Sequence, residues 1–177
     1  MCSSDLVSAS SGAAKIGDAK MTAITVGGAF AGDFALGGSI SLNKVGSVVD
    51  AYVKNGGLAQ GGTTLTISAS DDSKMDSLAG SIVGASSAAI GAALATHEIS
   101  GRVSAYVDNA KAVSNGSLLT VRATGASKLR SLTVGGQFAS TFAAGGAISL
   151  NKLTNTISAS LRNNADVDAV GAIQVQA

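Results

Sequence analysis

Apolar and polar residues alternate along several short stretches of this chain. In the run 103–107, three apolar residues share one face, whereas Ser104 and Tyr106 share the other. The runs 49–53 and 157–161 follow the same rule. Alternation with a period of two, bounded by Gly and Asn, is typical of a half-buried β-strand. We therefore expect strands whose alanines face a narrow core, namely Ala51, Ala105 and Ala159, and whose tyrosines point outward, namely Tyr52 and Tyr106.

The strand-like phrases recur at a fixed distance of 54 residues. Similar phrases begin at Ala51, Ala105 and Ala159, and a second set of apolar runs begins at Leu65, Leu119 and Ile173. The segment 39–44 returns as 147–152, two periods later, while the middle copy is more diverged and carries Thr96-His97-Glu98 there. A fixed period of this size predicts a solenoid built from stacked repeats.

The predicted fold class is all-β, a parallel β-helix (β-solenoid) with three coils of about 18 residues in each 54-residue repeat. Fifty-four residues exceed the length we expect for one coil, and the middle copy divides at roughly 65–82, 83–102 and 103–118. About nine coils, each rising about 4.8 Å, would form a rod of about 45 Å. Gly and Asn supply the corners, and the candidates are Asn55-Gly56-Gly57, Gly61-Gly62, Asn109, Asn115-Gly116 and Asn163-Asn164.

The chain divides into a short segment that lies outside the repeats and one repetitive domain. Residues 1–6 fit no repeat and resemble the read-through of a sequencing adapter, so they are excluded from the fold prediction. Residues 7–177 are predicted to form a single solenoid fragment with copies at approximately 7–64, 65–118 and 119–177. The first copy carries extra residues before Met21, which we expect in a surface loop.

The composition limits both the core and the partners. There are 23 Gly, no Pro, no Trp, two Tyr and four Phe, so the interior must be narrow enough for small side chains to fill. The formal net charge is +1 without any basic run, which gives no support for binding to nucleic acid. The only cysteine, Cys2, lies in the segment 1–6 that is excluded from the fold prediction, so no disulfide is expected.

Two uncharged stretches allow a different interpretation. Residues 77–97 and 131–151 carry no formal charge and are long enough for transmembrane helices. They are rich in Ser, Thr and Gly, and the first copy of this region carries Asp33, which is costly in lipid. A pair of strands accounts for all three copies, so we expect no transmembrane segment here.

The repeat phrases resemble those of a known group of bacterial proteins. Gly-Gly-Ser-Ile-Ser-Leu-Asn-Lys-Val at 37–45, followed by the phrases at 51–55 and 65–70, resembles the repeats of leukotoxin-type filamentous adhesins. These belong to the large filamentous-haemagglutinin-like and autotransporter exoproteins. The resemblance covers essentially all of 7–177. It implies a secreted β-helical stalk that is displayed on the bacterial cell surface, and it brings no catalytic residues. Because a solenoid presents the same surface repeatedly, we expect contacts with host glycans or proteins through a repeated face.

The strongest candidates for chemistry are acidic. Asp71, Asp72 and Asp76 follow a predicted strand, and paired carboxylates are the catalytic groups of glycoside hydrolysis. The equivalent positions one repeat later are not acidic, so solvated turn charges are the preferred interpretation. Calcium binding is a further option, but the glycine–aspartate nonapeptide of calcium-binding β-rolls is absent. Asp166 and Asp168 form a weaker pair.

The pair His97-Glu98 departs from the repeat and could act in acid–base chemistry or hold a metal. With one histidine in the chain, a surface turn in a diverged copy is the preferred interpretation. Four Gly-Gly pairs lack the Lys-Ser/Thr that follows a phosphate-binding loop, so corners or tight packing are expected, at Gly27-Gly28, Gly37-Gly38, Gly135-Gly136 and Gly145-Gly146.

These observations predict a structural or adhesive segment of a secreted bacterial surface protein, with no catalytic, cofactor-binding or metal-binding residues. Its nearest partners would be neighbouring coils of the full-length protein. A carbohydrate-active β-helix enzyme is the first alternative and requires converging carboxylates. An ice-binding solenoid is the second and requires a ladder of threonines, yet Thr63, Thr64 and Thr66 recur only in part, as Ser117, Leu118 and Thr120.

Overall fold

The computed structural model describes residues 5–11 and 20–177, and for 5–11 the backbone only. Every regular element in these ranges is a β-strand. The strands are β1 (Asp5–Ser11), β2 (Lys20–Ala31), β3 (Phe34–Lys54), β4 (Leu58–Gly61), β5 (Thr64–Asp71), β6 (Lys74–Ala85), β7 (Ala88–Asp108), β8 (Lys111–Ser114), β9 (Leu118–Gly125), β10 (Lys128–Phe138), β11 (Phe142–Arg162), β12 (Asp166–Ala169) and β13 (Ala172–Gln176).

The strands form four parallel sheets, in which each strand pairs with its counterparts in neighbouring repeats. The sheet orders are β1-β5-β9-β13, β10-β6-β2, β11-β7-β3 and β12-β8-β4. No two consecutive strands of the chain are neighbours in a sheet, so the backbone hydrogen bonds run along the stacking axis. This is the arrangement of a parallel β-solenoid, and the predicted fold class is confirmed.

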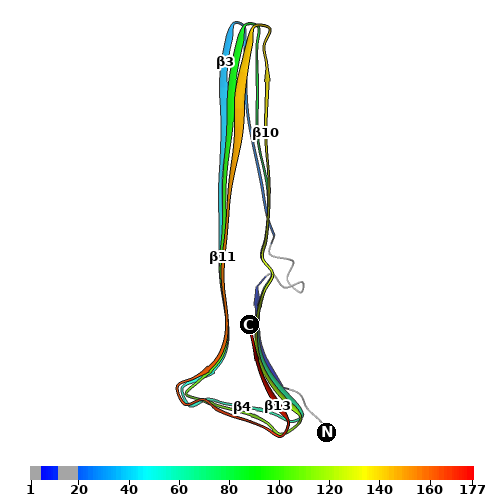
Figure 1. Ribbon diagram of the computed structural model, residues 1–177, viewed down its shortest axis with the longest axis vertical. Coiled ribbons are helices and arrows are strands. Elements are labelled where there is room, and N and C mark those ends of the chain that lie inside the picture. Colours follow the sequence, from blue (N-terminus) through cyan, green and yellow to red (C-terminus); the bar gives the residue numbers. More distant parts are fainter. Residues whose placement is uncertain (1–4, 12–19) are drawn as a thin grey trace.

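The predicted subdivision of the repeat is wrong. Ala105 pairs with Ala51 on one side and with Ala159 on the other, so one whole 54-residue repeat makes a single coil. The segments 65–82, 83–102 and 103–118 are parts of one coil, and three coils stack where nine were expected. A single coil can be this long because most of it is flattened: β6 and β7 run close together along a narrow arm (Figure 1), so a long perimeter encloses little volume.

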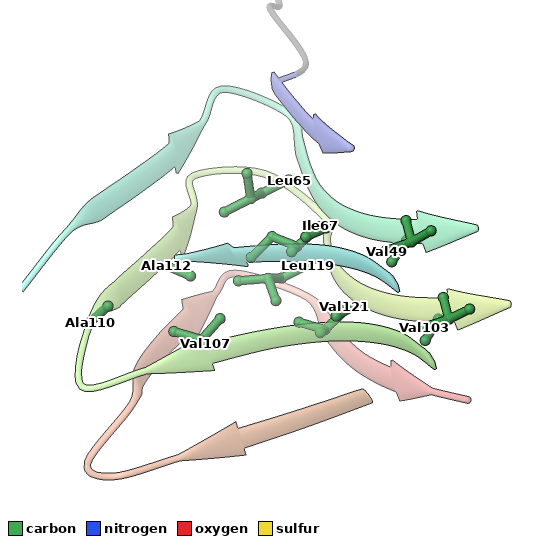
Figure 2. Packing of buried hydrophobic residues seen from close by; sticks show 13 residues of the cluster. Val49, Leu65, Ile67, Val103, Val107, Ala110, Ala112, Leu119 and Val121 are labelled. Carbon is green, nitrogen blue, oxygen red and sulfur yellow. The ribbon is translucent and has the colours of Figure 1, made fainter. Parts of the chain in front are cut away.

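The broad end of each coil holds the main hydrophobic core. Here the coil opens into a triangle, and β4 and β13 lie along two of its sides (Figure 1). Apolar side chains of several strands meet inside it, and Figure 2 shows Leu65 and Leu119, which are stacked on neighbouring strands of one sheet, together with Val107 in this interior. The fully buried members come mostly from β5, β7, β8 and β9, because each of these strands is covered by a paired strand on both sides. Burial of apolar surface between stacked coils is therefore the main stabilising term at this end.

The arm has an interior of small side chains. Ala79, Val83, Ala89 and Ala95 are fully buried between its two sheets. In the third coil, the hydroxyl oxygens of the facing residues Ser131 and Ser149 lie 2.7 Å apart, so the interior there is about two small side chains wide. The composition rich in Ala, Ser and Gly, noted from the sequence, is what allows this approach.

Left-handed backbone occurs at one of the predicted corners of each coil, the one that follows the long strand, and not at Gly61-Gly62 or Asn115-Gly116. Asn55, Asn109, Asn163 and Asn164 have φ between 47° and 57°, and Gly56 has φ 76°. Asn tolerates this conformation better than other residues with a Cβ, and Gly adopts it freely. The repeated Asn therefore turns the chain out of the long strand at the same place in every coil.

The predicted inside–outside assignment of the strands is confirmed. Ala51 and Ala105 are buried, and Ala159 is partly buried against the same cluster. On the outer face, Tyr52 is exposed and Tyr106 is half-buried. Residues 77–97 and 131–151 form strands, and no helix that could span a membrane occurs among residues 5–11 and 20–177. Most of the predicted insertion, 12–19, lies outside the described residues. Strand β1 begins at Asp5, and the origin of residues 1–6 stays a prediction.

Candidate functional site

The three aspartates of the acidic stretch do not converge. Strand alternation sends Asp71 into the interior, where it is 1% exposed, and sends Asp72 and Asp76 outward. Asp72 pairs with Lys74 at 3.5 Å, and Asp76 pairs with Lys20 at 2.8 Å. The expectation of solvated charges therefore fits Asp72 and Asp76 and is wrong for Asp71. Asp71 therefore lies on the opposite face from Asp72 and Asp76 and cannot flank one glycosidic bond with either of them. Asp72 and Asp76 share the outer face, where each is held in a separate ion pair.

Asp71 is the centre of a buried polar cluster that joins all three coils. Its carboxylate accepts hydrogen bonds from the hydroxyls of Ser47 at 2.7 Å, Ser73 at 2.6 Å and Ser127 at 3.5 Å. Asn155 in turn donates to the Ser127 hydroxyl at 2.9 Å. A buried carboxylate requires such donors, because burial without hydrogen bonds costs several kcal/mol. The role of Asp71 in this arrangement is to fasten the coils together where the arm joins the broad end.

The cluster leaves no room for a side chain on Gly101. A Cβ at this position would lie 2.9 Å from the Asn155 side-chain oxygen and 3.1 Å from a carboxylate oxygen of Asp71. The Asn155 oxygen is buried and has no hydrogen-bond partner among the described residues. The sequence alone does not link Asp71 to Ser47, Ser127 or Asn155, because these residues lie 24 to 84 positions away and only the solenoid register brings them together.

His97 and Glu98 lie inside strand β7 and not in a surface turn, so that prediction is wrong. His97 points into the arm and is fully buried, whereas Glu98 points outward. Asn43 of the preceding coil donates its side-chain amide to Nδ1 of His97 at 3.1 Å. Nε2 of His97 is buried and has no partner among the described residues. The two side chains are on opposite faces of a strand, so they cannot act as an acid–base pair.

Burial lowers the pKa of His97 below its usual value. The unfolded chain therefore binds a proton more readily than the folded chain does, and the free energy of unfolding should fall as the pH drops below about 6.5. The variant His97→Asn, which copies Asn43 and Asn151, should lose this dependence between pH 7 and pH 5. Urea unfolding at several pH values measures it. The prediction fails if the slopes of the two proteins agree, since the chain has no other histidine.

Charged side chains on the outer face form ladders whose signs alternate from coil to coil. Lys44, Glu98 and Lys152 occupy one ladder, in which Glu98 pairs with both lysines, at 3.2 Å and 3.4 Å. These two lysines hold the pKa of Glu98 below its usual range. Three further ladders place opposite signs in neighbouring coils, and they are Lys54–Asp108–Arg162, Asp76–Arg130 and Lys111–Asp166. Cross-strand pairs of opposite charge stabilise the stack, each by a few tenths of a kcal/mol.

The weak acidic pair of the third coil belongs to this system. Asp166 lies 2.9 Å from the ammonium of Lys111 in the middle coil. Hydrogen bonding to Asp166, together with the charge of Asp168, raises the pKa of Lys111. Within the described ranges, no group of three or more His, Cys, Asp or Glu side chains could hold a metal ion.

One charged ladder breaks the alternation. Lys20, Lys74 and Lys128 are in register at the first position of β2, β6 and β10. Together with Arg130 and Asp76 they line a pocket of about 250 Å³. This site was missed from the sequence, although its signal is present there as a lysine that recurs at an interval of 54 residues.

The outward tyrosines form a short stack rather than an open platform. The rings of Tyr52 and Tyr106 are 5.3 Å apart and inclined by 15°. Lys54 lies over the Tyr52 ring, and the guanidinium of Arg162 lies 3.9 Å from the Tyr106 ring centroid. Because these contacts cover ring faces, the tyrosines stabilise coil stacking through cation–π and aromatic contacts.

The glycine pairs and threonines have structural explanations. The pairs lie within β2, β3, β10 and β11, and a Cβ on Gly37 would lie 2.9 Å from Val83 and 3.0 Å from Ala29. Tight packing is confirmed at Gly27, Gly37, Gly38 and Gly145, whereas a Cβ would be accommodated at Gly28, Gly136 and Gly146. None of the pairs forms a corner, because all of them lie within strands. In the sheet β1-β5-β9-β13, Thr66 pairs with Thr120. The positions on either side of these two threonines are occupied by Leu6 and Gln174. Along this ladder of the described sheet, the threonines therefore do not form a continuous surface of the ice-binding kind.

Large apolar side chains cover the outer faces of the arm. They form ladders such as Ile40–Leu94–Ile148, beside which lies an apolar hollow of about 510 Å³ lined also by Ala92. Even in the covered middle coil, Ile82 is 47% exposed. Within each ladder, the apolar side chains of neighbouring coils lie one above the other, and this arrangement favours the stacking of the coils in the arm.

The fold places this chain in the class of all-β repeat proteins with a parallel β-solenoid. Comparison with protein-family models, with curated proteins and with solved structures finds no match for it. The functional interpretation therefore depends on the geometry of the coils and on the charged groups that they repeat.

Proposed function

We propose that this chain is a structural and adhesive shaft segment of a secreted bacterial surface protein. The observation that carries the proposal is the constant 54-residue register of β6 and β7 with their neighbours on both sides. Each coil repeats the outer positions of the last at a rise of about 4.8 Å. A shaft of this kind presents the same surface many times, and weak contacts then add through multivalency.

The charges and buried groups support a scaffold more than a catalyst. The acidic residues that could act on a polymer are divided between the interior and two separate ion pairs. Asp71 and His97 are buried among groups of neighbouring coils and have contacts suited to stacking. Secretion, surface display and contact with host glycans or proteins follow from the resemblance to filamentous adhesins and remain part of this proposal.

Duplicating coils should lengthen the molecule in one direction only. A chain in which residues 65–118 occur four times in tandem gains three coils and should grow by about 14 Å along the stacking axis. Its cross-section should not change. Small-angle X-ray scattering of this chain and of the original measures both quantities.

A wider cross-section, or the scattering of a flexible chain, would contradict the shaft. A panel of acidic and neutral polysaccharides, incubated with the original chain, tests the enzyme alternative. Cleavage that disappears in the variant D72N/D76N, with the fold intact by circular dichroism, would favour the enzyme.

A further inference from the structure

The three lysines in register are the exception to the charge pattern of the outer face. Elsewhere on the described part of the chain, charged residues in neighbouring coils of one ladder have opposite signs. Lys20, Lys74 and Lys128 repeat one sign through all three coils. Like charges directly opposite in a sheet destabilise it, so this ladder opposes the stacking that the other ladders favour.

The surroundings of the ladder keep it cationic. Arg130 adds a fourth positive charge on the rim of the same pocket, to which Asp76 contributes the one carboxylate. Asp76 pairs with Lys20, and Asp72 pairs with Lys74. No acidic side chain of the described residues forms an ion pair with Lys128, which is exposed at the edge of the third coil.

We propose that the ladder Lys20–Lys74–Lys128, with Arg130, binds an acidic polysaccharide that runs along the stacking axis. This proposal rests on the proposed adhesive function and names its partner class. The lysines are spaced by one coil rise, about 4.8 Å, comparable with the length of one sugar unit in an extended polysaccharide. Carboxylate or sulfate groups would lie between the ammonium groups and relieve their mutual repulsion.

The site fits a polysaccharide better than a nucleic acid. Proteins that hold single-stranded nucleic acid combine a positive groove with aromatic side chains on which bases stack, and the residues lining this pocket include no aromatic one. Asp72 and Asp76 can accept hydrogen bonds from the many hydroxyls of a polysaccharide, whereas the phosphates of DNA offer no donor to them. The whole chain has a net charge of only +1.

Binding to heparin and to polygalacturonate, with neutral dextran and single-stranded DNA as comparators, tests the proposal by titration calorimetry. The original chain should bind both acidic polysaccharides and not dextran. The variant K74A/K128A should bind at least roughly tenfold more weakly, and the slope of log affinity against log salt should fall by about two. The matched variant K44A/K152A removes the same charge from an alternating ladder and should change the affinity by less than about twofold.

Circular dichroism and thermal midpoints establish that the variants fold, and the single variant K128Q, at an exposed edge position, serves if the double variant does not. It should weaken binding by about threefold and lower the salt slope by about one. Equal losses in the two double variants, or no binding by the original chain, would overturn the site. Binding to DNA as tight as to heparin would replace the polysaccharide with a nucleic acid. The scattering of the duplicated chain is independent of all these outcomes, so the shaft and the binding site can fail separately.

Discussion

Replacing Ala95 with phenylalanine should lower the free energy of unfolding by about 3 kcal/mol or more. Ala95 is fully buried in β7, in register with Ser149, whose hydroxyl in the next coil already contacts Ser131 across the interior. A phenyl ring would have to push the two sheets of the arm apart. Overpacking of this kind costs about 1–3 kcal/mol, and more where neighbours cannot move. Urea unfolding followed by circular dichroism measures the change.

The matched control lies three residues away on the same strand. Ala92 is exposed on the outer face of β7, so Ala92→Phe should change the free energy of unfolding by less than about 0.5 kcal/mol. Similar unfolding midpoints for A95F and A92F would show that the interior of the arm is not closely packed. That result would contradict the flattened coil.

Replacing Asp71 with alanine should cost about 3 kcal/mol, because hydrogen bonds to a charged group contribute about 1.5–3 kcal/mol and the buried donors lose their acceptor. The hydroxyls of Ser47, Ser73 and Ser127 come from three successive coils, so the variant should also lose cooperativity between coils. Differential scanning calorimetry should show a lower thermal midpoint and a broader transition.

Asp72→Ala is the control for this variant. Its carboxylate is on the outer face, 41% exposed, and pairs with Lys74 at 3.5 Å, so its removal should change stability by less than about 0.5 kcal/mol. If D71A were as stable as D72A, the buried cluster would contribute nothing to the joining of coils. If D72A were the less stable of the two, the inside–outside assignment of β5 and its extension would be reversed.

The acidic residues were only partly placed correctly from the sequence. The sequence placed Asp71, Asp72 and Asp76 together because they are neighbours in the chain, but a strand sends adjacent side chains to opposite faces. Asp71 lies two positions after Ala69, on the same face of its strand, so alternation could have identified it as buried. Ser127 and Asn155 could not have been found in this way, since their link to Asp71 depends on how the coils are stacked.

The sequence by itself determined the local structure and the repeat. Period-two alternation identified the strands and the inward alanines, the recurring Asn marked the corners, and the distance of 54 residues set the register between copies. These features are local or periodic, so they can be read without knowing how the chain closes on itself. Only the tertiary structure decided that one repeat is one coil, because the number of coils depends on which strands face each other across the interior. The facing of β6 and β7 is possible since their small side chains let two sheets approach closely, and this flattening also brings Asp71, the buried His97 and the lysine ladder to their places.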